Sequence, residues 1–219
     1  MAIDDPNSQP IFRSAEVLSR VVVIGLLTFS LLQLTMIGIA TTVLVAVSSD
    51  AVDASHDLLE KLEGVESFGL IAGIASFIFT ATVYSKWKYR SYRNLEALGV
   101  SDLRYTPAWA VGSYFVPILN LVRPFRAMND IWNGTLNQPL PRNAPLVSWW
   151  WAAWLLGNVL HRASNGFLRG AVTVSSVQVG LGVGLAGGVV MIASAILLVK
   201  VVRFVTVRQI ERQEMASLG

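Results

Sequence analysis

The uninterrupted apolar segment Val21–Val47 constrains the fold more than any other feature of the sequence. Its 27 residues carry no ionisable side chain, whereas about 20 predominantly apolar residues suffice for a helix to cross a bilayer. Inside lipid, a helix satisfies all of its backbone hydrogen bonds within itself. The segment is also about twice as long as the apolar core of a secretory signal, so we interpret it as an uncleaved membrane anchor.

Three later segments repeat this pattern, namely Ser67–Tyr84, Leu146–Ala163 and Ser176–Val202. The second of them is short, and four tryptophans crowd its first half, as is typical of the headgroup level. Charged residues make up 14% of the chain, against about 25% in soluble proteins. The sequence therefore predicts an all-α membrane protein with four transmembrane helices, in a single integral membrane domain over residues 1–219. The predicted spans are about 21–47, 67–84, 146–163 and 176–202.

The distribution of lysine and arginine predicts the orientation of these helices. The region 85–145 holds eight of the 17 basic residues, and the loop 48–66 holds one beside six acids. Four crossings with both termini in the cytoplasm place fourteen of the 17 on the cytoplasmic side, in agreement with the positive-inside rule. The pI near 9.4 then reflects orientation and contact with anionic lipid headgroups, not binding to nucleic acid.

Residues 107–122 form an apolar segment that is too short to cross a bilayer and contains a proline, Pro117. A fifth crossing here would place Arg123 and Arg126 outside, against the positive-inside rule. We therefore expect a proline-broken hairpin on the cytoplasmic side, either re-entrant or lying flat at the interface. Backbone groups freed by the break need partners, and we expect the Asn120 side chain to hydrogen-bond to the backbone or to a neighbouring side chain.

The stretch from Tyr84 to Trp132 carries a further pattern. An aromatic–Arg–Asn helix follows the second span, and the motifs Pro-x-Trp-Ala-x-Gly and Val-Pro-x-x-Asn-Leu-x-x-Pro come after it. The pattern resembles an uncharacterised bacterial membrane family, the domain of unknown function 4328. The resemblance implies a place in the bacterial cytoplasmic (inner) membrane, and it brings no established activity with it. The matched positions are Arg90, Asn94, Pro107, Trp109, Gly112, Pro117, Asn120, Pro124 and Trp132.

Polar residues within this stretch form a candidate contact site. Arg90 and Asn94 lie four residues apart, so both face one side of a helix, and Asn120, Arg123 and Arg126 could approach them from the broken segment. One interpretation is a polar pocket that presents arginines to an anion, a lipid headgroup or a partner protein. The other is a hydrogen-bonded clasp that anchors the hairpin, because freed backbone groups need partners in any case.

Small residues form rows on two of the predicted spans. Gly180, Gly184 and Gly188 recur every four residues, and so do Gly69 and Gly73. Such rows allow the backbones of two helices to approach closely in lipid. They predict helix packing, either between the second and fourth spans of one chain or at an interface between membrane subunits.

Several classes of function lack their usual residues in this sequence. The chain has no cysteine, and its two histidines have no partner at metal-ligand spacing. No nucleophile motif, phosphate-binding loop or zinc motif occurs. The first and second predicted spans, and the fourth as far as Lys200, also lack the buried acids and bases of coupled transporters and intramembrane proteases. We therefore expect no catalytic site, no metal and no cofactor.

These observations favour a non-enzymatic integral membrane protein. Its expected role is that of an accessory, assembly or regulatory subunit that acts through helix–helix and lipid contacts. The expected partners are membrane lipids and either further copies of the chain or a larger membrane complex, and not nucleic acid. The alternative is an oligomeric pore or small-solute conduit built around the hairpin and the glycine-rich fourth span.

Overall fold

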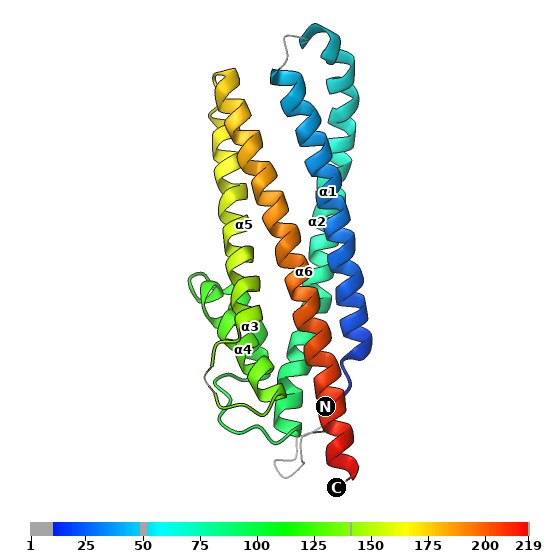
Figure 1. Cartoon of the computed structure of the whole chain (residues 1–219), viewed down its shortest axis with the longest axis vertical. Coiled ribbons are helices and arrows are strands. Elements are labelled where there is room, and N and C mark those ends of the chain that lie inside the picture. The colour runs from blue at the N-terminus through cyan, green and yellow to red at the C-terminus, as the bar shows by residue number, and fades with distance from the viewer. Residues whose placement is uncertain (1–10, 49–51, 141, 219) are drawn as a thin grey trace. The chain divides into compact units, whose positions relative to one another are not determined.

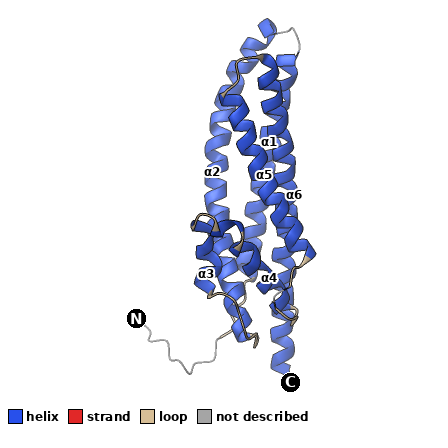
Figure 2. Cartoon of the chain, turned by 90° about the vertical axis from the view of Figure 1, so that its left-hand side faces the viewer, coloured by secondary structure: helices blue, strands red, loops and turns tan. Residues whose placement is uncertain are grey.

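The computed structural model describes residues 11–48, 52–140 and 142–218. Within these ranges every regular element is a helix and no strand occurs (Figures 1 and 2). No side chain is described at residues 47–63 and 65–67, which include most of the predicted acidic outer loop. The elements are α1 (Glu16–Ser48), α2 (Val52–Ala97), α3 (Pro107–Gly112), the 3-10 turns η1 (Ser113–Phe115) and η2 (Leu119–Leu121), α4 (Arg123–Thr135), α5 (Pro145–Arg169) and α6 (Val174–Leu218).

Three of the helices contain stretches that are long and apolar enough to cross a membrane. These stretches are Glu16–Ala46, Phe68–Ala97 and Val174–Leu218, with hydropathies of 2.2, 1.7 and 2.4. The predicted all-helical membrane class is thereby confirmed. α5 does not meet the same criterion, because tryptophans occupy its first half and polar residues its second. A fourth crossing, by α5, stays a prediction.

Two helices continue well past the apolar runs that identified them. α2 continues from Tyr84 to Ala97, and α6 continues from Val202 to Leu218. The added part of α6 is rich in glutamine, glutamate and arginine, which favour helices, and it buries Thr206 and Gln209. Hydropathy therefore marks only the apolar part of each helix, and tertiary contacts stabilise the polar part.

The segment between α3 and α4 is broken near Pro117, as predicted. η1 and η2 replace a continuous helix, and Val116 and Ile118 flank the proline with φ angles of −102° and +68°. A positive φ is rare for a β-branched residue, so the chain is strained at Ile118. The predicted side-chain hydrogen bond of Asn120 is absent among the described residues. Its backbone N–H donates instead to the Val116 carbonyl at 3.0 Å, so this backbone donor is paired within the turn.

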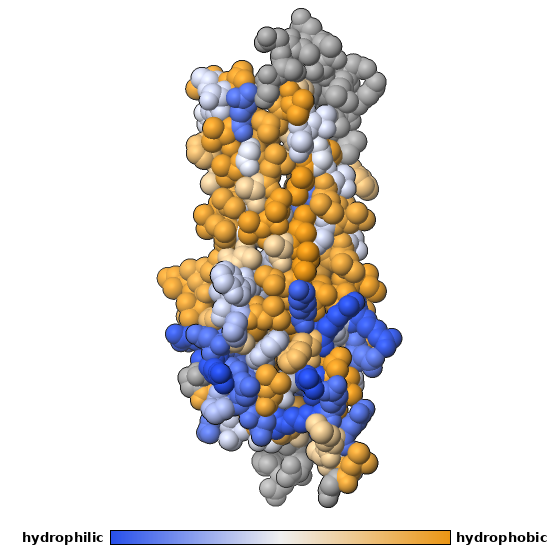
Figure 3. Space-filling view, in the orientation of Figure 1, coloured by the Kyte–Doolittle hydropathy of each residue, from blue (hydrophilic) through white to orange (hydrophobic). Residues whose placement is uncertain are grey.

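Contacts within the chain group it into two compact units. The first unit combines the N-terminal part up to Val23 with Ala81–Ser148 and the part from Val199 onward. The second unit combines Ile24–Thr80 with Trp149–Leu198. α3 and α4 lie entirely in the first unit. On the face shown in Figure 3, most hydrophilic side chains gather over elements of the first unit, and the second unit presents a largely apolar surface.

A buried lysine attaches the broken segment to α2 inside the first unit. Lys88 is fully buried, and its ammonium donates to the Pro124 carbonyl at 2.9 Å and to the Tyr114 hydroxyl at 3.2 Å. The ammonium also lies 4.6 Å from the centroid of the Tyr114 ring, a distance at which the cation is attracted to the ring face. The Tyr84 and Tyr114 hydroxyls are 3.0 Å apart. Lys88 therefore ties η1 and the start of α4 to one face of α2.

A second buried charge, Asp130 on α4, fixes the loop that follows α2. Its carboxylate is fully buried and accepts hydrogen bonds from the Arg104 Nε at 2.9 and 3.1 Å and from the Tyr92 hydroxyl at 3.3 Å. The Arg104 Nη2 also bonds to this carboxylate and to the Arg126 carbonyl. Burial alone would lower the pKa of Arg104. The hydrogen bonds and charge of Asp130 raise this pKa by more, so that it lies above its ordinary value. The Arg104 guanidinium therefore stays charged.

The last turns of α6 complete the first unit. Gln209 is buried and donates to the Ser91 carbonyl at 3.0 Å and to the Thr135 hydroxyl at 3.1 Å. Arg212 donates to the carbonyls of Leu98 and Gly134. These carbonyls belong to the C-terminal ends of α2 and α4, where helices have unpaired acceptors. The last turns of α6 therefore cap the ends of α2 and α4 within the first unit.

In the second unit, glycines on α6 lie against α5 and α1. A Cβ atom added to Gly180 would lie 2.8 Å from Leu168, and one added to Gly184 would lie 2.7 Å from the Ser164 hydroxyl. That hydroxyl donates to the Gly180 carbonyl at 2.8 Å. Gly188 faces Gln33 of α1 instead. Among the described residues, these α6 glycines therefore pack against α5, just beyond the third predicted span, and against α1, and not against α2.

The glycines of α2 behave differently from each other. Gly69 lies against Met36 of α1, whereas nothing else in the described part of the chain comes within 4 Å of a Cβ at Gly73. The tryptophans at the start of α5 also divide, since Trp149 is 68% exposed while Trp150 and Trp151 are buried. Only part of each small-residue or aromatic row therefore serves packing within the chain.

Replacing Gly184 by leucine should loosen the contact between α5 and α6. The added side chain would displace Ser164 and its hydrogen bond to Gly180, and we expect a loss of stability of roughly 1 kcal/mol or more. Thermal unfolding in mild detergent measures this loss. Gly73→Leu is the matched control, because that site has open space. Equal melting temperatures for the two variants would contradict this account of the packing.

Replacing Arg104 by glutamine should destabilise the first unit. The variant leaves the Asp130 carboxylate buried without its cation, which costs about 3 kcal/mol or more. Arg126→Gln is the control, since Arg126 is exposed and its side chain makes no hydrogen bond or ion pair in the described part of the chain. Resistance to proteolysis between α2 and α3 reports on the first unit specifically. A loss of resistance equal in both variants would show that general surface charge, not the Asp130 pair, is responsible.

Candidate functional site

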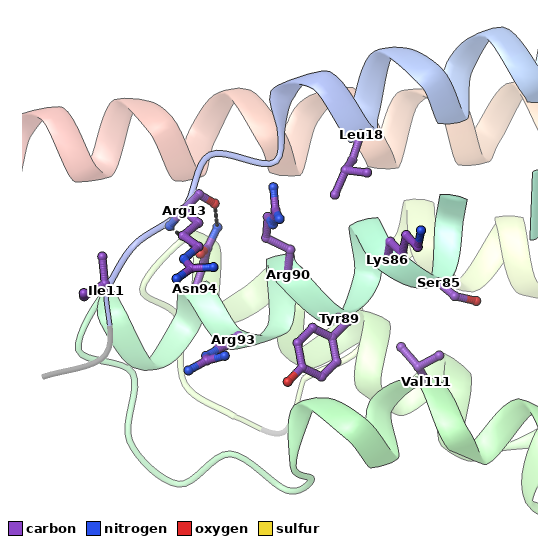
Figure 4. Close-up of a pocket in the computed structure, with 10 residues that line it drawn as sticks. All are labelled: Ile11, Arg13, Leu18, Ser85, Lys86, Tyr89, Arg90, Arg93, Asn94 and Val111. Carbon is purple, nitrogen blue, oxygen red and sulfur yellow. Dashed lines mark hydrogen bonds between the residues drawn. The ribbon is translucent and has the colours of Figure 1, made fainter. Parts of the chain in front are cut away.

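A groove of about 410 Å³ opens on the first unit between α2 and the segment that precedes α1 (Figure 4). We call the segment Ile11–Ala15 the N-terminal strap, and we call the hollow the basic groove. The strap contributes Ile11 and Arg13, α1 contributes Leu18, and α3 contributes Val111. The remaining lining residues come from one stretch of α2, Ser85–Asn94.

Four cations line the basic groove. Lys86, Arg90 and Arg93 follow one another at intervals of four and three residues on α2, so they share one face of the helix. Arg13 joins them from the strap, and Figure 4 shows it beside Asn94. No acidic side chain is among the described residues that line the groove. The groove therefore carries a concentrated positive charge.

Three of these cations are free to bind a ligand. In the described part of the chain, the side chains of Arg13, Lys86 and Arg93 make no hydrogen bond or ion pair. Arg90 donates through Nη1 to the Ser14 carbonyl at 3.2 Å and keeps its other guanidinium donors. Like charges at this spacing repel one another, and an anion in the groove would relieve that repulsion.

Asn94 holds the strap against α2. Its Oδ1 accepts from the Arg13 backbone N–H at 3.1 Å, and its Nδ2 donates to the Arg13 carbonyl at 2.9 Å. Nδ2 is also 3.3 Å from the Gln209 Oε1. Because Asn94 is only 2% exposed, it positions the strap and is not itself offered to a ligand. The clasp uses the backbone of Arg13 and leaves its guanidinium to face the groove.

The rest of the groove wall is apolar. Ile11 is 75% exposed, and Leu18 and Val111 are half-buried. Tyr89 lies among the cations on α2 and is exposed as well. The basic groove therefore combines positive charge with an apolar surface, which suits a ligand that is itself amphipathic.

The structure separates the contact residues proposed from the sequence. Arg90 and Asn94 line the basic groove, whereas Asn120, Arg123 and Arg126 do not. The Arg123 guanidinium lies 5.6 Å from the Trp109 ring and 6.0 Å from the Tyr105 ring, and Asn120 is half-buried on η2. Asn94 and Arg90 do form a clasp, but it holds the N-terminal strap and not the predicted hairpin. Contact of Arg90 with an anion stays a prediction.

Three of the groove cations were not proposed as site residues from the sequence. Lys86 and Arg93 are recognisable from the sequence as bases beside the second span that attract anionic headgroups, and with Arg90 they form a row at helical spacing. Arg13 could not, because its place depends on the tertiary contact with Asn94. The buried Lys88 carried a signal as well, since it lies four residues from both Tyr84 and Tyr92 and so shares their face of the helix.

No group of three or more potential metal ligands occurs among the described residues. The two buried charges also lack the arrangement of a catalytic pair. Lys88 donates to a carbonyl and a tyrosine, and Asp130 is held by Arg104 and Tyr92.

The comparisons with known proteins place the chain in a family without an assigned function. The family Domain of unknown function (DUF4328) matches residues 46–207. No curated protein and no solved structure is matched. The match covers most of the chain and includes Tyr84–Trp132, where the sequence resemblance lies. The chain therefore belongs to the DUF4328 family.

Proposed function

We propose that the chain is a non-enzymatic integral membrane protein that acts as an accessory, assembly or regulatory subunit. It works through contacts with lipid headgroups and with neighbouring membrane helices. The observation that carries this proposal is a difference between two sets of polar groups, those buried in the protein and those at the basic groove. Buried polar side chains bond to one another or to the backbone, with only the Thr80, Ser91 and Ser113 hydroxyls unpaired among the described residues. The unpaired cations of the basic groove lie at the surface.

The proposed protein crosses the bacterial cytoplasmic (inner) membrane four times, with both termini in the cytoplasm. α5 supplies the fourth crossing. It has 25 residues, which give a helix of about 37 Å, enough to span a bilayer. Its contacts with α6 in the second unit, through Ser164 and the glycines, support this arrangement. The positive-inside rule sets the direction.

The broken segment contributes an apolar surface that lipid would cover. Phe115 is 80% and Ile118 is 79% exposed, and Trp109, Leu121 and Val122 are also exposed. Contiguous exposed apolar residues mark a membrane or protein contact. The Arg123 guanidinium beside Trp109 suits the headgroup level, where arginine and tryptophan both gather. These exposures support a hairpin that lies in the cytoplasmic interface or re-enters the membrane from it.

Cysteine labelling tests the topology, because the chain has no native cysteine. Ser101→Cys should react with a membrane-impermeant maleimide only after the cells are opened. Ile118→Cys should stay largely unreactive from both sides until the membrane is dissolved, since lipid covers it. Reaction of Ser101→Cys in intact cells would exclude the four-span arrangement. Rapid reaction of Ile118→Cys in opened cells would exclude burial of the hairpin in lipid.

An oligomeric pore or small-solute conduit is the second candidate function. One observation favours it. In the second unit the Gln33 Nε2 lies 3.4 Å from the His161 Nε2, which joins polar side chains of α1 and α5 within an apolar environment. Polar groups at membrane depth commonly mark a pathway. The same pair also stabilises helix packing, and for that reason we rank the conduit second.

Reconstitution in liposomes separates the two candidates. The purified chain should pass neither ions nor small solutes. The double variant Arg90→Gln/Arg123→Gln should insert normally but retain less lipid or partner protein, by about 1 kcal/mol for each charge near an anionic surface. Gln33→Leu is the control for the conduit. The conduit would replace the proposal if the purified chain conducts and either Gln33→Leu or the double variant changes that conductance.

A further inference from the structure

We infer that the basic groove is a binding site for the phosphate headgroup of an anionic phospholipid, completed by Arg13 of the N-terminal strap. The inference rests on the lipid contact in the proposed function and identifies its place and its ligand. The sequence pointed to Arg90, Asn94, Asn120, Arg123 and Arg126 for such a contact. The site keeps Arg90 from this set and combines it with Arg13, Lys86 and Arg93, which line the same hollow.

The charge of the groove selects an anion. Arg13, Lys86 and Arg93 have no protein partner in the described part of the chain, and no described acid lines the hollow to neutralise them. Arginine guanidinium groups bind phosphate oxygens with two parallel hydrogen bonds. Four cations exceed what one phosphate diester needs. We therefore expect a lipid with two phosphates in its headgroup to bind more tightly than one with a single phosphate.

The place of the groove along the chain selects a lipid over a free anion. Lys86 comes two residues after Tyr84, where the apolar run of α2 ends, and Leu18 comes three residues before Val21, where that of α1 begins. Both helices therefore leave the apolar region at the groove. Basic residues next to a membrane span lie at the level of the lipid phosphates.

The apolar wall supports the same choice. Ile11, Leu18 and Val111 line the hollow beside the cations. Inorganic phosphate would leave these side chains in water, whereas the glycerol and first methylene groups of a phospholipid would cover them. The volume of about 410 Å³ falls within the range of about 300–1,000 Å³ that ligand pockets occupy.

The strap makes the site depend on Asn94. Asn94 grips the Arg13 backbone through two hydrogen bonds, and Arg90 donates to the next carbonyl, Ser14. The Arg13 guanidinium reaches the groove only while this clasp is closed. Asn94 is therefore a positioning residue for the site, and Arg13 is a residue that contacts the lipid phosphate.

Lipid titration of the purified full chain tests the site. The chain in neutral detergent is titrated separately with cardiolipin, phosphatidylglycerol, phosphatidylcholine and inorganic phosphate. Melting temperature and native mass spectrometry measure binding. We expect cardiolipin to bind most tightly, phosphatidylglycerol more weakly, and the other two not to bind measurably. Lys86→Gln and Arg93→Gln should each weaken cardiolipin binding about fivefold.

Matched variants distinguish a built site from general positive charge. Arg203→Gln removes one exposed cation from α6 in the same unit but outside the groove, and it should leave cardiolipin binding unchanged. Arg13→Gln should weaken binding about as much as Lys86→Gln. The Asn94→Ala variant should weaken binding too, and adding Arg13→Gln to it should have little further effect. Arg13→Gln keeps the backbone clasp, so it tests the site even if Asn94→Ala unfolds.

Each outcome decides the inference. Equal losses in Arg203→Gln and Lys86→Gln would show diffuse attraction and overturn the site. Binding of inorganic phosphate as tight as that of cardiolipin would overturn the choice of a phospholipid. Fully additive effects of Asn94→Ala and Arg13→Gln would overturn the role of the strap. Conductance or turnover by the purified chain would overturn the proposed function, and unchanged cardiolipin binding in the groove variants would overturn the groove whatever the protein does.

Discussion

The buried ammonium of Lys88 is the interaction on which the first unit depends. A chain broken at Val116–Ile118 loses the regular hydrogen bonds that would hold a continuous helix in place. Lys88 supplies a substitute, because it donates to Pro124 beyond the break and to Tyr114 before it. Burying a charge without partners is costly, so this position tolerates a lysine only while both acceptors and the Tyr114 ring surround it. The break and the lysine therefore require each other.

Two faces of α2 carry different residues: one face packs into the first unit, and the other lines the basic groove. Tyr84, Lys88 and Tyr92 point into the first unit and are buried, while Lys86, Arg90 and Arg93 point into the basic groove. Helical spacing alone produces this division, since each set repeats every three or four residues. The buried set fixes the depth and rotation of α2 against α4. Because the buried set holds α2 in place, the cations of the exposed set have a fixed orientation in the groove, which a row of cations on an isolated helix would not have.

The sequence predicts those features that follow from local composition. The all-helical class, the break at Pro117 and the family depend on runs of apolar residues, on a proline and on a motif, and the structure and comparisons confirm them. The partners of α6 glycines, the place of Arg13 and the paired state of Asp130 depend on which segments meet in space. Between Glu96 and Glu211 the chain has only two acids, Asp102 and Asp130. That scarcity could have indicated that one of them is held inside, but not by which arginine.

The choice of an amide at position 94 connects the fold to the charge of the groove. Gripping the Arg13 backbone from both sides requires a donor and an acceptor on one side chain, and asparagine provides both. A carboxylate at this position could accept from the Arg13 N–H but would face its carbonyl and Gln209 Oε1 with no hydrogen to donate. It would also place a negative charge beside Arg13 and neutralise part of the groove. A neutral amide closes the strap and leaves every positive charge available to an anion, so the residue that builds the site is also the one that keeps it basic.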